Sequence, residues 1–240
     1  MILMKLSRLL ISATLGVATV LGLSAQQNIQ DYTLKVDDFD ELIVSDGICV
    51  DYYASTDSAG YIKYSCSPQM ASRLIFTPNK AKLKIQVDDV DNRAIIDLPR
   101  ITVMSSVLAR VQNYGDSLVR VMTLTPTSSL KLRVEGNGTI IANDIHTTSL
   151  NASTNYGAGR IILNGKAGKA KLSSLGTGTI EAGNLEAKQV SVRITGTGNV
   201  DCYATEKLNY SGSGSGKVYY KGDPEVKKSL ALGIKVVKVE

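Results

Sequence analysis

Apolar and polar residues alternate through most of this chain, and after residue 135 the alternation recurs in copies. Five short runs read "TIIA", "RIIL", "TIEA", "NVDC" and "KVYY", and the second residue of every run is Ile or Val. Side chains two apart in a strand lie on one face, so the second and fourth positions of each run face the same way. The second positions are Ile140, Ile161, Ile180, Val200 and Val218, and the fourth are Ala142, Leu163, Ala182, Cys202 and Tyr220.

A second alternating run follows most of these, for example Val190, Val192 and Ile194 between polar neighbours. Asn and Gly stand between the runs, as in "NG" at 164–165, and such residues favour turns. No segment of this region has the spacing of an amphipathic helix. Each copy is therefore predicted to be strand, turn, strand, turn, in an all-β fold.

Two glycines separated by one residue precede each of the five runs. The steps between successive pairs are 21, 19, 20 and 18 residues, and a nearly constant period of this size is typical of a solenoid. Stacking of such coils buries an apolar face that no single coil can bury alone. Because glycine adopts positive φ without steric cost, we place the pairs at the corners of the coils. The pairs are Gly136/Gly138, Gly157/Gly159, Gly176/Gly178, Gly196/Gly198 and Gly214/Gly216.

The stretch "SGSGSGKVYYKG" at 211–222 looks like a flexible linker or a phosphate-binding loop, but it is the fifth copy of the repeat. A Walker A loop needs glycine where Ser211 stands, Ser or Thr where Val218 stands, and a helix afterwards. The sequence therefore predicts a structural corner here, with no nucleotide site.

Residues 26–100 also alternate, but without the regular period. One run spans 44–52 and another spans 62–66, and we expect them to pair as a hairpin around a turn at 55–60. The β-rich segment would cover the first coil, whose unpaired edge would otherwise invite aggregation. We therefore divide the mature chain into this N-terminal part, 26–100, and Gly-x-Gly coils, 101–240, within one continuous domain, 31–240.

The first 25 residues have the order of a secretory signal peptide. Lys5 and Arg8 precede an apolar run from Leu9 to Leu23, and small residues follow before Gln26. We expect cleavage after Ala25 and export to the periplasm, the outer surface or the medium, with no membrane span left in the mature chain. The alternative is a retained N-terminal anchor.

Charge and cysteine content remove several function classes. The net charge is +5, but the basic residues stand singly among Thr, Ser and Gly, which argues against a nucleic-acid partner. The single histidine, His146, and the absence of C-x-x-C spacing argue against a zinc site. We expect no metal and no cofactor. We also expect three free thiols, because the apolar hairpin register puts Cys49 and Cys66 on opposite faces and Cys202 points inward.

The late copies of the repeat resemble a known family, the "putative auto-transporter adhesin, head GIN domain" proteins of Bacteroidetes-type bacteria. The matching stretches are "LSSLGTGTIEAGNL", "VRITGTGNVDCYA" and "LNYSGSGSGKVYYKGDPEVKK". The segment "FDELIVSDGICVDYY" is similar to the family's opening strand, with Cys49 where the family name has Asn. The resemblance covers 36–239, and it implies a right-handed parallel β-helix and an extracytoplasmic location. A fold alone does not establish adhesion.

Four outward residues are candidates for a surface binding site. Glu181 and Asp201 follow equivalent glycines and should lie about 5 Å apart on adjacent coils, where they could share a cation or a proton. Two solvated carboxylates are the favoured interpretation. Tyr203 and Tyr219 also point outward and could contact a sugar, although strand packing is the commoner role of such tyrosines. His146 is interpreted as a loop residue beside Thr147.

The sequence favours an exported, non-enzymatic β-helix protein with a surface-binding role, whose partner could be a glycan or another component of the envelope or of a host surface. No residue is assigned a catalytic role. Two alternatives stay open. One is a polysaccharide-active enzyme, which would need clustered carboxylates. The other is a periplasmic structural or assembly protein.

Overall fold

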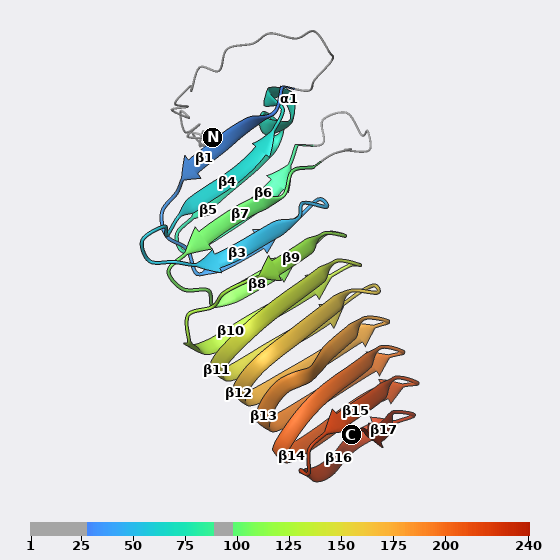
Figure 1. The fold of residues 1–240 in the computed structure, drawn as a ribbon. Helices are drawn as coiled ribbons and strands as arrows, with labels where there is room; N and C mark the ends of the chain where they lie inside the picture. Colours follow the sequence, from blue (N-terminus) through green and yellow to red (C-terminus); the bar gives the residue numbers. More distant parts are fainter. Residues whose placement is uncertain (1–27, 89–97) are drawn as a thin grey trace, which may run out of the picture.

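The protein is an elongated stack of β-strands in which successive coils of the chain lie on one another (Figure 1). The computed structural model describes residues 28–88 and 98–240, so the predicted signal peptide lies outside the described residues. The all-β solenoid predicted from the glycine period is confirmed. The described residues also contain one short helix, α1 (Pro68–Ala71), whose N-cap is Ser67.

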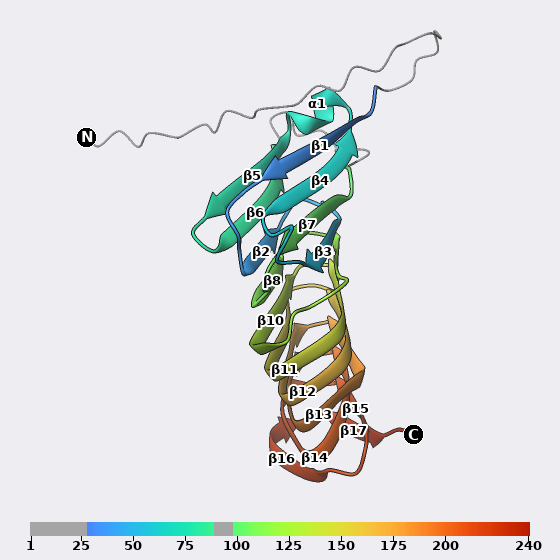
Figure 2. The ribbon, with the colours of Figure 1, turned by 60° about the vertical axis from the view of Figure 1, so that its left-hand side comes forward.

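Two walls of strands face each other across the apolar interior (Figure 2). Most neighbours along each wall are parallel, as expected for stacked coils. The first wall contains β1 (Gln30–Lys35), β4 (Tyr61–Cys66), β7 (Ile101–Ser105), β3 (Val50–Ala54), β9 (Leu118–Val121), β15 (Lys217–Lys221) and β17 (Lys235–Lys238). The second wall contains β5 (Leu74–Asn79), β6 (Lys82–Val87), β2 (Glu41–Val44), β8 (Arg110–Asn113), β10 (Thr127–Glu135) and β16 (Glu225–Leu232).

Four long strands bend from the first wall into the second and form the regular middle of the stack. Their first residues pair along the first wall, and their later residues pair along the second. They are β11 (Thr139–Asn155), β12 (Arg160–Gly176), β13 (Thr179–Gly196) and β14 (Asn199–Gly214).

The predicted interior column of branched residues is confirmed. Each member pairs with the next in the parallel register, and each side chain is completely buried. The column continues toward the N-terminal end through Val119, Val50 and Ile101. Burial of each such side chain contributes about 1.5–3 kcal/mol, so the column is a principal source of stability. The five predicted members are Ile140, Ile161, Ile180, Val200 and Val218.

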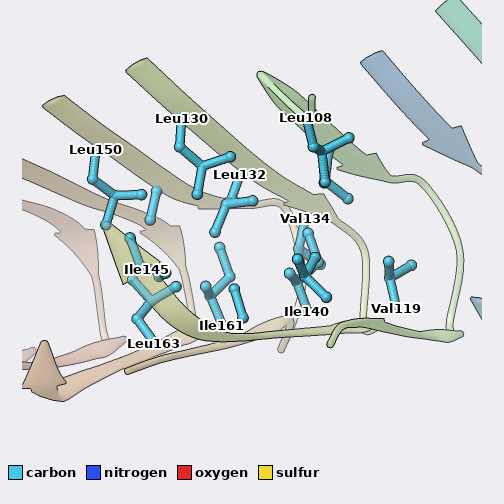
Figure 3. Packing of buried hydrophobic residues seen from close by; sticks show 14 of the residues in the cluster. Leu108, Val119, Leu130, Leu132, Val134, Ile140, Ile145, Leu150, Ile161 and Leu163 are labelled. Atoms are coloured by element: carbon cyan, nitrogen blue, oxygen red, sulfur yellow. The ribbon is translucent and has the colours of Figure 1, made fainter. Parts of the chain in front are cut away.

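Leucines of the second wall fill the space opposite this column. Leu130 and Leu132 point toward Ile140 and Ile161, and Leu150 points toward Ile145 (Figure 3); all six side chains are buried. The interior between the two walls is therefore packed with side chains and leaves no channel for a ligand at this level.

The two glycines of each corner are needed for different reasons. The first has a positive φ, for example 114° at Gly176 and 124° at Gly196. The second leaves no room for a side chain, since a Cβ added at Gly198 would lie 2.3 Å from the Gly178 carbonyl oxygen and from Ser174 Oγ. Positive φ therefore explains only half of the Gly-x-Gly pattern, and close contact between coils explains the other half.

Buried hydroxyl groups support these corners from inside. Ser174 Oγ donates to the Gly178 carbonyl oxygen at 2.8 Å, and Thr154 Oγ1 donates to Ser174 Oγ at 3.3 Å. Both residues are about 1% exposed. A buried hydroxyl group without a partner would be costly, so these bonds fix the corner geometry.

The N-terminal third does not follow the order of the sequence. The coil made by β2 and β3 lies between the coil of β6 and β7 and the coil of β8 and β9. Figure 1 shows β3 between β7 and β9 along the first wall. The run 44–52 is consequently two strands and not one, because Asp46 (φ 61°) and Gly47 (φ 78°) turn the chain between β2 and β3.

Antiparallel strands close this end of the stack. β4 pairs with β7 and β1 pairs with β4 on the first wall, while β5 pairs with β6 on the second. These pairs give the terminal coil the hydrogen-bonding partners that an exposed edge would lack. A covering role for the N-terminal segment was expected, but the same segment also supplies the internal coil of β2 and β3. The division of the chain at residue 100 stays a prediction.

The predicted hairpin between the strands at 50 and 62 is wrong. β7 lies between β3 and β4, with Ile101 opposite Val50 and Val103 opposite Ile62. Local alternation could not reveal a strand inserted from residues 101–105. Cys49 still lies away from Cys66, and both cysteines are free thiols together with Cys202.

Candidate functional site

The candidate carboxylates lie side by side on the outer face of the first wall. Glu181 of β13 and Asp201 of β14 are register partners, as the repeat predicted. They belong to a line of outward residues that we call the outer ladder. In spatial order the outer ladder consists of Thr102, Asp51, Arg120, Ile141, Ile162, Glu181, Asp201, Tyr219 and Val237.

Glu181 is already engaged by a cation. Arg160 Nε and Nη2 donate to the two carboxylate oxygens of Glu181 at 2.5 and 2.8 Å. An arginine beside the pair could not be predicted from the repeat, because Arg160 lies one coil away and two positions earlier in the strand. The expectation that Glu181 faces only solvent is therefore wrong. The two-point bond fixes its carboxylate and leaves it poorly placed to act as a nucleophile.

Asp201 has a different environment although it is adjacent. Its side chain is half-buried, and burial raises the pKa of its carboxyl group above the ordinary value, with a smaller upward contribution from the charge of Glu181. Lys221 acts in the opposite direction. Asp201 is thus the carboxylate of the pair that lacks a donor in the described part of the chain.

The two candidate tyrosines point outward on the coils that follow. Tyr219 is the register partner of Asp201, and Tyr203 lies on the same face between buried Cys202 and Ala204. Both rings are half-buried. Their predicted orientation agrees with the structure, while their role as binding residues stays a prediction.

Two shallow hollows lie beside these residues. The larger, of about 560 Å³, is lined by Tyr203, His146 and Lys166 among others. The smaller, of about 350 Å³, is lined by Glu181, Asp201 and Tyr219 among others. Gly183, Asn184 and Lys221 line both, so the hollows adjoin.

Sequence reasoning missed Asn184 and Lys221. The change in period, from a glycine step of 20 residues to a last step of 18, indicates that one coil is shortened, but it does not single out these two residues. The prediction that His146 is a loop residue is wrong, because His146 lies in β11, where its Nδ1 is 3.5 Å from the Asp144 carboxylate.

A second charged cluster lies at the capped end of the outer ladder. Arg120 donates to both oxygens of Asp51 at 2.7 and 2.5 Å, and Arg100 donates to Asp51 at 3.1 Å. The hydrogen bond from Arg120 lowers the pKa of Asp51 below its ordinary value. Because every charge here has a partner, this cluster is structural and joins three separate coils.

The described residues contain no group of three or more His, Cys, Asp or Glu side chains arranged to hold a metal ion. Among the same residues, no helix has the length and apolar character needed to cross a membrane.

A family model described as "Putative auto-transporter adhesin, head GIN domain" matches residues 38–224. The chain belongs to this family. The match begins just before β2 and ends after β15, so the head GIN domain includes the candidate residues and nearly all of the stack. No curated protein matches the chain.

Solved structures agree with this assignment. The crystal structure of a "putative adhesin" from Bacteroides fragilis NCTC 9343 has a TM-score of 0.82 and 25% sequence identity, covering 91% of this chain and 100% of that chain. A "putative lipid binding protein" from Parabacteroides distasonis ATCC 8503 has a TM-score of 0.72 at 23% identity, covering 90% and 98%. A "putative adhesin" from Parabacteroides merdae ATCC 43184 has a TM-score of 0.70 at 20% identity, also covering 90% and 98%. The last two likenesses show the fold alone.

Proposed function

We propose that this head GIN domain protein is exported and non-enzymatic, and that it binds a component of a cell surface or of the bacterial envelope. The observation that carries the proposal is that charged and polar side chains of the outer ladder are paired with protein groups at one end and lie beside open hollows farther along. At the capped end Asp51 is neutralised by arginines, whereas farther along Asp201 and Tyr219 line the smaller of two adjoining open hollows. Such groups on a rigid sheet suit recognition of a ligand from solution.

The enzyme alternative is less well supported by the carboxylates. A retaining glycoside hydrolase needs one carboxylate free to attack and another able to donate a proton. Asp201 has the raised pKa of a proton donor, but Glu181 is held by Arg160 at both oxygens. Export is supported by the N-terminal signal pattern and by membership of an adhesin family.

The test uses the mature chain from residue 26, labelled with a fluorophore. Binding is measured to intact cells, to isolated envelope fractions and to a glycan array, and hydrolysis is measured on the same glycans. Binding without hydrolysis is expected. Hydrolysis would support the polysaccharide-active enzyme. Absence of binding to all three, with protection from protease added to intact cells, would support the periplasmic structural or assembly protein.

A further inference from the structure

The repeat shortens at one corner, and the shortening produces a step on the outer surface. Ala182 pairs with Cys202, but the next pair is Glu186 with Tyr203. Residues 183–185 therefore have no counterpart in β14. Asn164 of β12 and Asn184 of β13 are register partners at this corner, and β14 has no equivalent residue. The larger hollow lies where that residue is absent, and we call this place the step.

Tyr203 lies on this step and is held by its neighbours. Its ring lies beside Gly222, where an added Cβ would come within 3.0 Å of Tyr203 Cε2 and 2.1 Å of the Ala204 carbonyl oxygen. Glu186 and Lys221 are its register partners on the two adjacent coils. The ring thus lies against the backbone at Gly222, and Tyr203 also lines the larger hollow.

The polar groups around the step lack protein partners. In the residues that the structure describes, the side chains of Asn184, Asp201, Tyr203, Tyr219 and Lys221 make no side-chain hydrogen bond and no ion pair. Neighbouring charged groups do find partners, as Lys166 does with Glu186 at 3.8 Å. The step therefore gathers donors and acceptors that are available to a ligand.

The charges of the step select among ligand classes. Asp201 and Lys221 are of opposite sign, Lys166 lies 3.8 Å from Glu186, and Glu181 is paired with Arg160. The larger hollow is also lined by the Asp144 carboxylate and by His146, whose Nδ1 lies 3.5 Å from it. A polyanion would meet Asp201 and Glu186, and a polycation would meet the two lysines. A neutral ligand rich in hydroxyl groups avoids both conflicts. It can use the carboxylate as an acceptor, the ammonium as a donor and the amide as both.

We propose that the step around Tyr203 binds a neutral saccharide, whose apolar face lies on the ring of Tyr203 and whose hydroxyl groups bond to Asp201, Asn184 and Lys221. This inference rests on the proposed binding function and names its ligand class. The two adjoining hollows extend over more than one coil, so the ligand is an oligosaccharide rather than a single sugar.

The test uses maltotetraose, cellotetraose, mannotetraose and chitotetraose as probes, with affinities measured by calorimetry on the mature chain. We expect at least one to bind, and Tyr203→Ala to weaken that binding about tenfold or more. Asn184→Ala and Lys221→Ala should each weaken it by a factor of roughly two to ten, as expected for one lost hydrogen bond. Tyr53→Ala is the matched control, because Tyr53 is an exposed tyrosine outside the step.

A second variant separates loss of binding from loss of folding. At Gly183 an added Cβ meets nothing nearer than Asp201 Cβ at 3.9 Å, so Gly183→Gln fills the step without backbone conflict. It should abolish saccharide binding with an unchanged melting curve. The proposal is overturned if no probe binds, or if Gly183→Gln binds as well as the wild type. Binding to cell envelopes that survives in Gly183→Gln would leave the proposed function intact and place its site elsewhere.

Discussion

Asp51 of β3 is bound at both carboxylate oxygens by Arg120 of β9, although 69 residues separate them in the chain. The contact joins an N-terminal coil to the first coil of the regular stack. Its acceptor is well buried, with 9% of the Asp51 side chain exposed. The Asp51–Arg120 interaction therefore depends on the contact between the coil of β3 and the coil of β9.

Replacing Asp51 with Asn should lower the free energy of unfolding at pH 7 by about 1.5–3 kcal/mol, as expected for lost hydrogen bonds to a charged group. The pKa of Asp51 is lowered in the folded protein, so its contribution is present above the unfolded value and is lost as pH falls through the folded value. Urea unfolding at pH 7 and at lower pH should show the difference shrinking with acid. Asp57→Asn, at an exposed position, is the control. Equal stability of Asp51→Asn and the wild type at pH 7 would contradict the assigned role.

Ile180→Asp should abolish cooperative unfolding. The side chain is completely buried between Ile161 and Val200, and a buried unpaired carboxylate costs several kcal/mol. Ile162→Asp places the same residue on the half-buried outer ladder and should leave a cooperative transition. Thermal melting followed by circular dichroism distinguishes the two, and identical curves for both variants would refute the interior column.

Gly198→Ala should destabilise the protein by about 1–3 kcal/mol, because the added methyl group conflicts with Gly178 and Ser174 across the corner. Gly183→Ala adds the same methyl group where the nearest atom is 3.9 Å away, so it should change stability little. Chemical unfolding of both variants measures the contrast. If Gly198→Ala leaves the free energy of unfolding unchanged, the coils are not in close contact at this corner.

The cysteines should count as three free thiols in denatured, unreduced protein. In the native protein Cys66 and Cys202 are buried, and burial raises the pKa of the Cys66 thiol and raises that of Cys202 to about 12. Since the thiolate is the reactive form, both should be alkylated far more slowly than the half-buried Cys49. Mass spectrometry after timed alkylation measures the order. A count of one thiol in denatured protein would reveal a disulfide.

The double variant Glu181→Gln/Asp201→Asn should change stability by no more than about 0.5 kcal/mol. It loses the exposed ion pair with Arg160, which contributes little, and it removes a carboxylate whose raised pKa marks an unfavourable charge. The two effects oppose each other. If the wild type hydrolyses a glycan and the double variant does not, the enzyme alternative is correct.

The regular half of the fold could be predicted because its pairings repeat at nearly constant separation. Ile161 pairs with Ile180 on the next coil, so the spacing of the glycines predicts the register between coils. The N-terminal third could not be predicted in this way. Val50 pairs with Ile101 and Val119, and nothing in the local alternation around residue 50 specifies partners so far away.

The candidate site shows the same limit. The adjacency of Glu181 and Asp201 follows directly from the period. The diagonal contact of Arg160 with Glu181 depends on side-chain direction as well as on register. The step at Tyr203 depends on which residues drop out of a shortened coil, and the length of the coil alone does not give this.

The position of the β2–β3 coil between two later coils also determines how the chain can fold. The strands at 41–54 have no parallel neighbour until residues 82–121 are available, whereas each coil beyond 127 meets its neighbour about 20 residues away. Closing the longer loops costs more conformational entropy and delays their contacts. We therefore expect the C-terminal coils to acquire hydrogen-exchange protection first during refolding, and the N-terminal closure to form last.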